Sequence, residues 1–102
     1  MSRTLPRPPK IVDLHTDSFT DIEGYDIDEL ISLSIDRLRN SLDAAIYWEY
    51  TQIEFIHGKG KGILRKAVYE ELAYYKENGM ISSYHASYRN PDIVVVHIGL
   101  FG

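Results

Sequence analysis

With 102 residues, of which 44% are apolar and 25% charged, the chain has the size and composition of one globular domain rather than a disordered segment. The lack of cysteine excludes disulfides and cysteine-ligated zinc. No apolar run nears the roughly 20 residues of a membrane span, so we expect a cytoplasmic protein without a membrane partner. A net charge of −4 argues against a nucleic-acid partner, but the charges are strongly segregated along the chain.

The first ten residues are basic and rich in proline, and they contain no acid. Proline cannot join a regular hydrogen-bonded ladder, so this stretch is typical of an extended segment. We interpret residues 1–10 as a basic linker and residues 11–102 as the folded domain, which we expect to be one module of a longer protein. The residues concerned are Arg3, Arg7, Lys10, Pro6, Pro8 and Pro9.

The first third of the domain reads as a strand, a loop and a helix. An apolar-centred run over residues 10–15 predicts a strand, and the polar, acidic residues 16–25 predict a loop. Asp26 has the character of a helix N-cap, and Glu29 three residues later completes a capping box. Apolar residues then recur at helical spacing, which predicts an amphipathic helix over residues 27–47.

The remainder predicts a strand over residues 51–57, a helix over 62–78, and strands over 81–89 and 93–98 joined by a turn at Asn90-Pro91-Asp92. The order β-α-β-α-β-β indicates a two-layer α/β sandwich, with a four-stranded mixed sheet, two helices and two right-handed crossovers. Because the last strand is apolar on both faces, we expect it at a central position that is covered on both sides.

A glycine- and lysine-rich loop separates the second predicted strand from the second predicted helix. Loop N–H groups, the positive end of a helix dipole and cationic side chains together make an anion site, so this loop predicts phosphate binding. It lacks the Gly-Lys-Ser/Thr ending of a P-loop and the third glycine of a dinucleotide fingerprint. The candidate phosphate-binding residues are Gly58, Lys59, Gly60, Lys61, Gly62 and Arg65.

Candidate acid–base groups stand at the ends of the first two predicted strands. Asp13 and His15 are two residues apart and therefore on one side of the first strand, and His57 ends the second. If the strands are neighbours, these groups come together beside the loop and can support general acid–base attack on a phosphodiester. Asp13 could also hold Mg²⁺ or Mn²⁺, although the sequence supplies no convincing ligand set. The acidic stretch 17–29 is explained as well by a solvated loop as by an ion site.

Several ring side chains lie on the last two predicted strands. Tyr84 and Tyr88 alternate along the third strand and could stack on nucleobases if their face is open, with sheet packing as the alternative. We interpret His85 and His97 as sheet-face residues rather than ligands.

Two motifs resemble those of a known family. Val12-Asp13-Leu14-His15, together with the segment from His57 to Arg65, resembles the signature motifs of the Smr (small MutS-related) domain, and the element order matches over residues 10–99. The resemblance implies a fold similar to the C-terminal domain of a bacterial translation initiation factor. It also implies nucleic-acid binding, often with DNA-nicking or RNA-cleaving endonuclease activity. One departure is Thr16, where family members usually have glycine.

The resemblance implies that the family's important positions correspond here to Asp13 and His15 in the first motif and to His57, Gly58, Gly60, Gly62 and Arg65 in the second, which agrees with Asp13, His15 and His57 as the catalytic candidates. Three functions remain open. The first is an endonuclease acting on RNA or DNA, and the second is a non-catalytic module that docks a larger protein on nucleic acid or the ribosome. The third is a small-molecule phosphate or nucleotide binder.

Overall fold

The computed structural model describes residues 5–14, 26–58 and 62–99. The predicted loop over residues 16–25 therefore lies outside the described residues, as do His15, Lys59, Gly60 and Lys61. The element order confirms the predicted β-α-β-α-β-β sequence. The elements are β1 (Ile11–Asp13), α1 (Ile27–Tyr47), β2 (Gln52–Ile56), α2 (Ile63–Glu77), β3 (Ser83–Ala86) and β4 (Ile93–His97).

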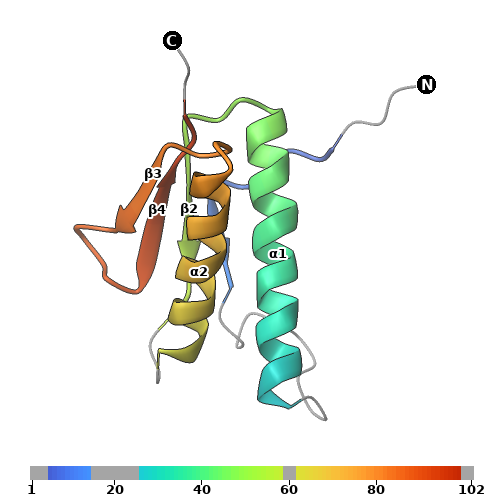
Figure 1. Ribbon diagram of the computed structural model, residues 1–102, viewed down its shortest axis with the longest axis vertical. Coiled ribbons are helices and arrows are strands. Elements are labelled where there is room, and N and C mark those ends of the chain that lie inside the picture. Colours follow the sequence, from blue (N-terminus) through green and yellow to red (C-terminus); the bar gives the residue numbers. More distant parts are fainter. Residues whose placement is uncertain (1–4, 15–25, 59–61, 100–102) are drawn as a thin grey trace.

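The four strands form one mixed sheet in the order β1-β2-β4-β3. The β1 and β2 strands are parallel, whereas β4 runs antiparallel to both β2 and β3. Each helix connects two parallel strands, and both connections step in the same direction across the sheet. As a result α1 and α2 lie side by side on one face, as Figure 1 shows, which confirms the two-layer prediction.

The capping box that the sequence predicts begins α1. The backbone N–H of Glu29 donates to the Asp26 carboxylate at 2.8 Å, and the backbone N–H of Asp26 donates to the Glu29 carboxylate at 3.2 Å. Two N–H groups at the helix start are satisfied in this way, and the acids of the first turn suit the positive end of the helix dipole. This local signal explains why the predicted start of α1 is correct.

The core lies between the sheet and the two helices. Alternate strand residues face the helices, since successive side chains of a strand point to opposite faces. Phe55 of β2 is fully buried, flanked in register by Val12 of β1 and Val94 of β4. The helices contribute the fully buried Leu38, Leu42, Val68 and Leu72.

The opposite face of the sheet, which we call the open face, has neither helix on it (Figure 1). The predicted central place of β4 is confirmed, but the expectation that layers cover it on both sides is wrong for the described elements. Both connections turn to the same side, so the apolar character of β4 has another cause. Val95 is only 8% exposed because Glu54 and His85 flank it in register on this face.

The β3 strand is shorter than the predicted 81–89, because the chain leaves the ladder after Ala86 and the backbone N–H of Ser87 donates to Ile93 across the start of a turn. Tyr84 is paired with buried Val96 and packs against Tyr69 of α2, with ring centroids 5.7 Å apart. The predicted alternation of Tyr84 with Tyr88 along one strand is therefore wrong, since Tyr88 lies in the turn.

The described part of the N-terminal segment packs on the domain. Trp48 donates from its indole N–H to the Leu5 carbonyl at 2.8 Å, and the Tyr50 hydroxyl donates to the Pro8 carbonyl at 2.6 Å. Arg7 lies over the Trp48 ring at 4.3 Å. The role of residues 1–10 as a linker to another domain stays a prediction. Neither described helix is long and apolar enough to cross a membrane.

Candidate nucleic-acid interface

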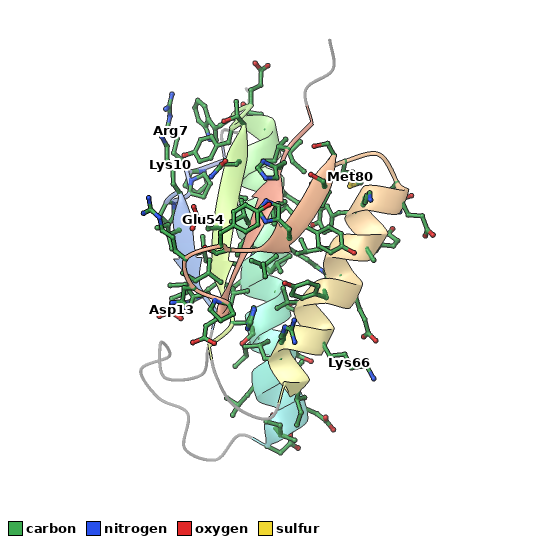
Figure 2. All side chains as sticks on the ribbon, turned by 90° about the vertical axis from the view of Figure 1, so that its left-hand side faces the viewer. Arg7, Lys10, Asp13, Glu54, Lys66 and Met80 are labelled. Carbon is green, nitrogen blue, oxygen red and sulfur yellow. The ribbon has the colours of Figure 1, made fainter. Side chains whose placement is uncertain are left out.

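The carboxyl ends of β1 and β2 meet at one edge of the sheet, as the sequence reasoning requires. Asp13, the last residue of β1, is paired with Ile56, the last residue of β2, and the Leu14 N–H donates to the Ile56 carbonyl at 2.8 Å. In Figure 2, Asp13 lies at the same end of the molecule as Lys66 in the first turn of α2. The predicted acid and the start of α2 thus share one end of the fold.

The side chains of Asp13 and His57 leave this end from opposite faces. Asp13 is paired with Ile56 and shares its open face, whereas His57, one residue later, points to the helix side. Burial supports this assignment, because His57 is only 3% exposed and its ring centroid lies 6.2 Å from that of Tyr69 in α2. The structure brings the strand ends together but places these two groups on different sides.

The surroundings of His57 favour its neutral imidazole form. Burial lowers the pKa of His57 below its usual value, and the charge of Arg65 acts in the same direction, while a hydrogen bond to Gly58 opposes them. Nδ1 lies 3.1 Å from the Gly58 carbonyl, which suits an Nδ1–H donor. The buried Nε2 has no hydrogen-bond partner among the described residues, and the same is true of the Tyr69 hydroxyl.

Two residues of α1 also reach this end of the sheet, and the sequence reasoning missed them. The Arg37 guanidinium donates from Nη1 to the Asp13 carbonyl at 3.1 Å, and the Ser34 hydroxyl donates to the Leu14 carbonyl at 2.7 Å. Ser34 is fully buried, so its bond satisfies a carbonyl that water cannot reach. Their spacing of three places them on one helix face, but only the packing of α1 shows which strand that face meets.

The glycine loop begins and ends with left-handed backbone conformations. The φ angles are +78° at Gly58 and +82° at Gly62, values that other residues rarely adopt. The N–H groups of His57 and Gly58 both donate to the Asp92 carbonyl, at 3.0 and 3.2 Å. The β3–β4 turn is therefore fixed to the start of the loop, a contact that the sequence does not reveal.

The start of α2 differs from that of α1 in ways that suit an anion. Gly62 is its N-cap and supplies no side-chain hydrogen bond, and the first turn contains no acid. Arg65 and Lys66 lie in this turn instead, and the Arg65 guanidinium is 5.3 Å from the centre of the Tyr69 ring. A helix start whose N-cap offers no side-chain acceptor, close to two cations, is typical of a phosphate site.

We expect Gly62→Ala to lower the free energy of unfolding by about 1–2 kcal/mol, through backbone strain alone. A Cβ built at Gly62 meets no atom within 4 Å, so crowding contributes nothing, whereas the φ of +82° is costly for alanine. Gly62→Asn is the matched control and should cost less, because asparagine visits this conformation more readily. Urea unfolding measures both, and equal losses would contradict the conformational explanation.

The predicted Mg²⁺ or Mn²⁺ ligand is a separate question. Within residues 5–14, 26–58 and 62–99, no three histidine, aspartate or glutamate side chains gather as a metal-ligand set. Most of the acidic stretch 17–29 lies outside these ranges, so the metal at Asp13 stays a prediction.

Comparison with known proteins agrees with this arrangement. The Smr domain family model matches residues 20–98. The "Endonuclease MutS2" of Staphylococcus saprophyticus is 39% identical over 70 residues, a match that covers 69% of this chain but only 8% of that protein. The crystal structure of the Smr domain of Thermus thermophilus MutS2 superimposes with a TM-score of 0.63 at 25% identity, over 90% of this chain and 100% of that one. The chain therefore belongs to the Smr domain family.

Proposed function

We propose that this Smr domain binds nucleic acid and cleaves or nicks phosphodiester bonds in RNA or DNA. The observation that carries the proposal is the start of α2, where the N-cap Gly62 supplies no side-chain acceptor and Arg65 and Lys66 lie in the first turn, after a glycine loop with two left-handed residues. The similarity to an endonuclease supports the reaction class, although this chain spans a small part of that protein.

In this proposal the loop amides, Lys59, Lys61 and Arg65 hold a phosphate next to the scissile bond. Asp13 activates the attacking nucleophile from the open-face side, and Arg37 at its carbonyl holds the end of β1 in place. The side chain of His57 is only 3% exposed and its neutral form is favoured, so it is better suited to positioning the loop than to exchanging protons with solvent. We therefore give His57 the positioning role and His15 the proton transfer.

A second candidate is a non-catalytic module that docks a larger protein on structured nucleic acid or the ribosome. The observation that favours it is the placement of Asp13 and His57 on opposite faces of the sheet, which separates two of the three predicted catalytic groups. This candidate requires the phosphate site but no cleavage.

Incubating the protein with labelled single-stranded RNA and with supercoiled DNA, with and without Mg²⁺ or Mn²⁺, distinguishes the two candidates. Products that appear with the wild-type protein and persist in both Asp13→Asn and His57→Ala would sink the endonuclease assignment. Binding without products under every condition supports docking.

We expect the double substitution Lys59→Ala/Lys61→Ala to weaken nucleic-acid binding and to reduce the salt dependence. Each phosphate contact that is lost should lower the slope of log affinity against log salt by about one, so the double variant should lose about two. Electrophoretic shift over a salt series measures the slope. Lys76→Ala, in the last turn of α2, is the control, because this residue lies at the opposite end of the helix from the loop. An equal loss in both variants would show that the attraction is not localised at the loop.

A further inference from the structure

A row of three rings lies on the open face at the β3–β4 hairpin. His85 of β3 and Tyr88 of the turn are stacked, with ring centroids 4.9 Å apart and planes 16° from parallel. The Nε2 edge of His85 meets His97 of β4, whose centroid lies 5.0 Å away at an interplanar angle of 28°. We call Tyr88, His85 and His97 the ring row.

The two histidines hold each other in place. Their Nε2 atoms are only 2.9 Å apart, whereas the ring centroids are 5.0 Å apart. Each ring therefore points its Nε2 atom at the other ring. The Nδ1 of His85 lies 2.9 Å from the Ala86 carbonyl, which suits an Nδ1–H donor. The His85 Nε2 is then the acceptor and His97 the donor, and with both nitrogens engaged the His85 ring is fixed.

Tyr88 is the outer member of the row and is 92% exposed. Its ring lies beside the hydrogen-bonded His85 imidazole and nearly parallel to it, and almost all of its surface is open to solvent. Arg89, also exposed, adds a positive charge at the next residue. A planar ring beside a cation matches a nucleotide, whose base has an aromatic face and whose backbone is anionic.

The same turn is attached to the start of the glycine loop. Asp92, four residues after Tyr88, accepts hydrogen bonds from both His57 and Gly58. The turn that carries Tyr88 is therefore attached to the start of the glycine loop, so one nucleic-acid ligand has both features at the same end of the β3–β4 hairpin. The bases of a duplex are already stacked on one another, whereas those of a single strand are available.

We propose that Tyr88, supported by His85 and His97, is a stacking site for an unpaired base of single-stranded nucleic acid. This inference rests on the proposed function and specifies its ligand. The site favours a single-stranded or locally melted segment over an intact duplex, and it tolerates any base because every base has an aromatic face.

The experiment measures affinities by fluorescence anisotropy with a short labelled single strand and with its duplex. Tyr88→Leu, which keeps an apolar side chain but removes the ring, should weaken single-strand binding by about 5- to 150-fold and leave duplex binding nearly unchanged. Tyr88→Phe keeps the ring and should bind the single strand with the wild-type affinity. The control is Tyr74→Leu, which removes a 57% exposed tyrosine from α2 and should have no effect.

The outcomes separate this inference from the function on which it rests. Wild-type protein that binds neither probe overturns both. Wild-type binding that is indifferent to Tyr88→Leu overturns the stacking site alone. A change of oligomeric state in Tyr88→Leu, seen by size-exclusion chromatography without a change in affinity, would assign the ring row to self-association and likewise overturn the proposal.

Discussion

We expect Asp13→Asn to lower the rate of phosphodiester cleavage by about 10²- to 10⁴-fold, the usual contribution of a general acid or base. The asparagine keeps the shape of the side chain but cannot accept a proton at neutral pH. Affinity for nucleic acid should not fall, because the substitution removes a negative charge near the phosphate. Single-turnover cleavage of a labelled strand measures the rate, and anisotropy measures the affinity.

Glu54→Gln is the matched control for this substitution. Glu54 lies on the same open face of the adjacent strand, paired with Ile11 of β1, but it is two residues before the strand end. If the two carboxylates act only through the overall electrostatic field, the two substitutions should change the cleavage rate equally. If Asp13 is catalytic, only Asp13→Asn should lower the rate. Equal rates for Asp13→Asn and the wild type would contradict the assigned role, and absence of cleavage in all proteins would support the docking function.

The elements that depend on local signals follow from the sequence alone. The capping box of Asp26 and Glu29 fixes the start of α1, and helical periodicity predicts its end at Tyr47. These signals act between residues a few positions apart, so they do not require knowledge of the tertiary fold. The positive φ of Gly58 and Gly62 belongs to the same class, because glycine is the residue that adopts it at low cost.

Other features depend on pairing between segments that are far apart in the sequence, and the sequence alone does not predict them. The motif places Asp13 and His57 at strand ends, but the register of Asp13 with Ile56 decides that they leave opposite faces. The alternating pattern of residues 81–89 in the sequence continues beyond Ala86, where the chain leaves the sheet. The pattern therefore wrongly predicts Tyr84 and Tyr88 on one strand. Arg37 reaches Asp13 only because α1 lies against the end of β1, and nothing in the local pattern shows this.

We expect Phe55→Ala to lower the free energy of unfolding by about 3–5 kcal/mol, the usual cost of removing a buried phenyl ring. This is a large share of the about 5–15 kcal/mol that stabilises a typical domain. Phe55 is the largest of the fully buried side chains and lies between Val12 and Val94 in the three neighbouring strands. Its removal leaves a cavity under both helices, and urea unfolding followed by circular dichroism measures the loss.

Ile11→Ala is the control, since it removes a 52% exposed apolar side chain from the edge strand and should change stability by no more than about 0.5 kcal/mol. Similar losses in the two variants would contradict the division into a helix-covered and an open face. Phe55 precedes His57 by two residues on the same face, so the cavity also loosens the packing around the histidine that holds Gly58. Phosphate affinity should therefore fall in Phe55→Ala even at temperatures where the variant is still folded, whereas Ile11→Ala should bind as the wild type does.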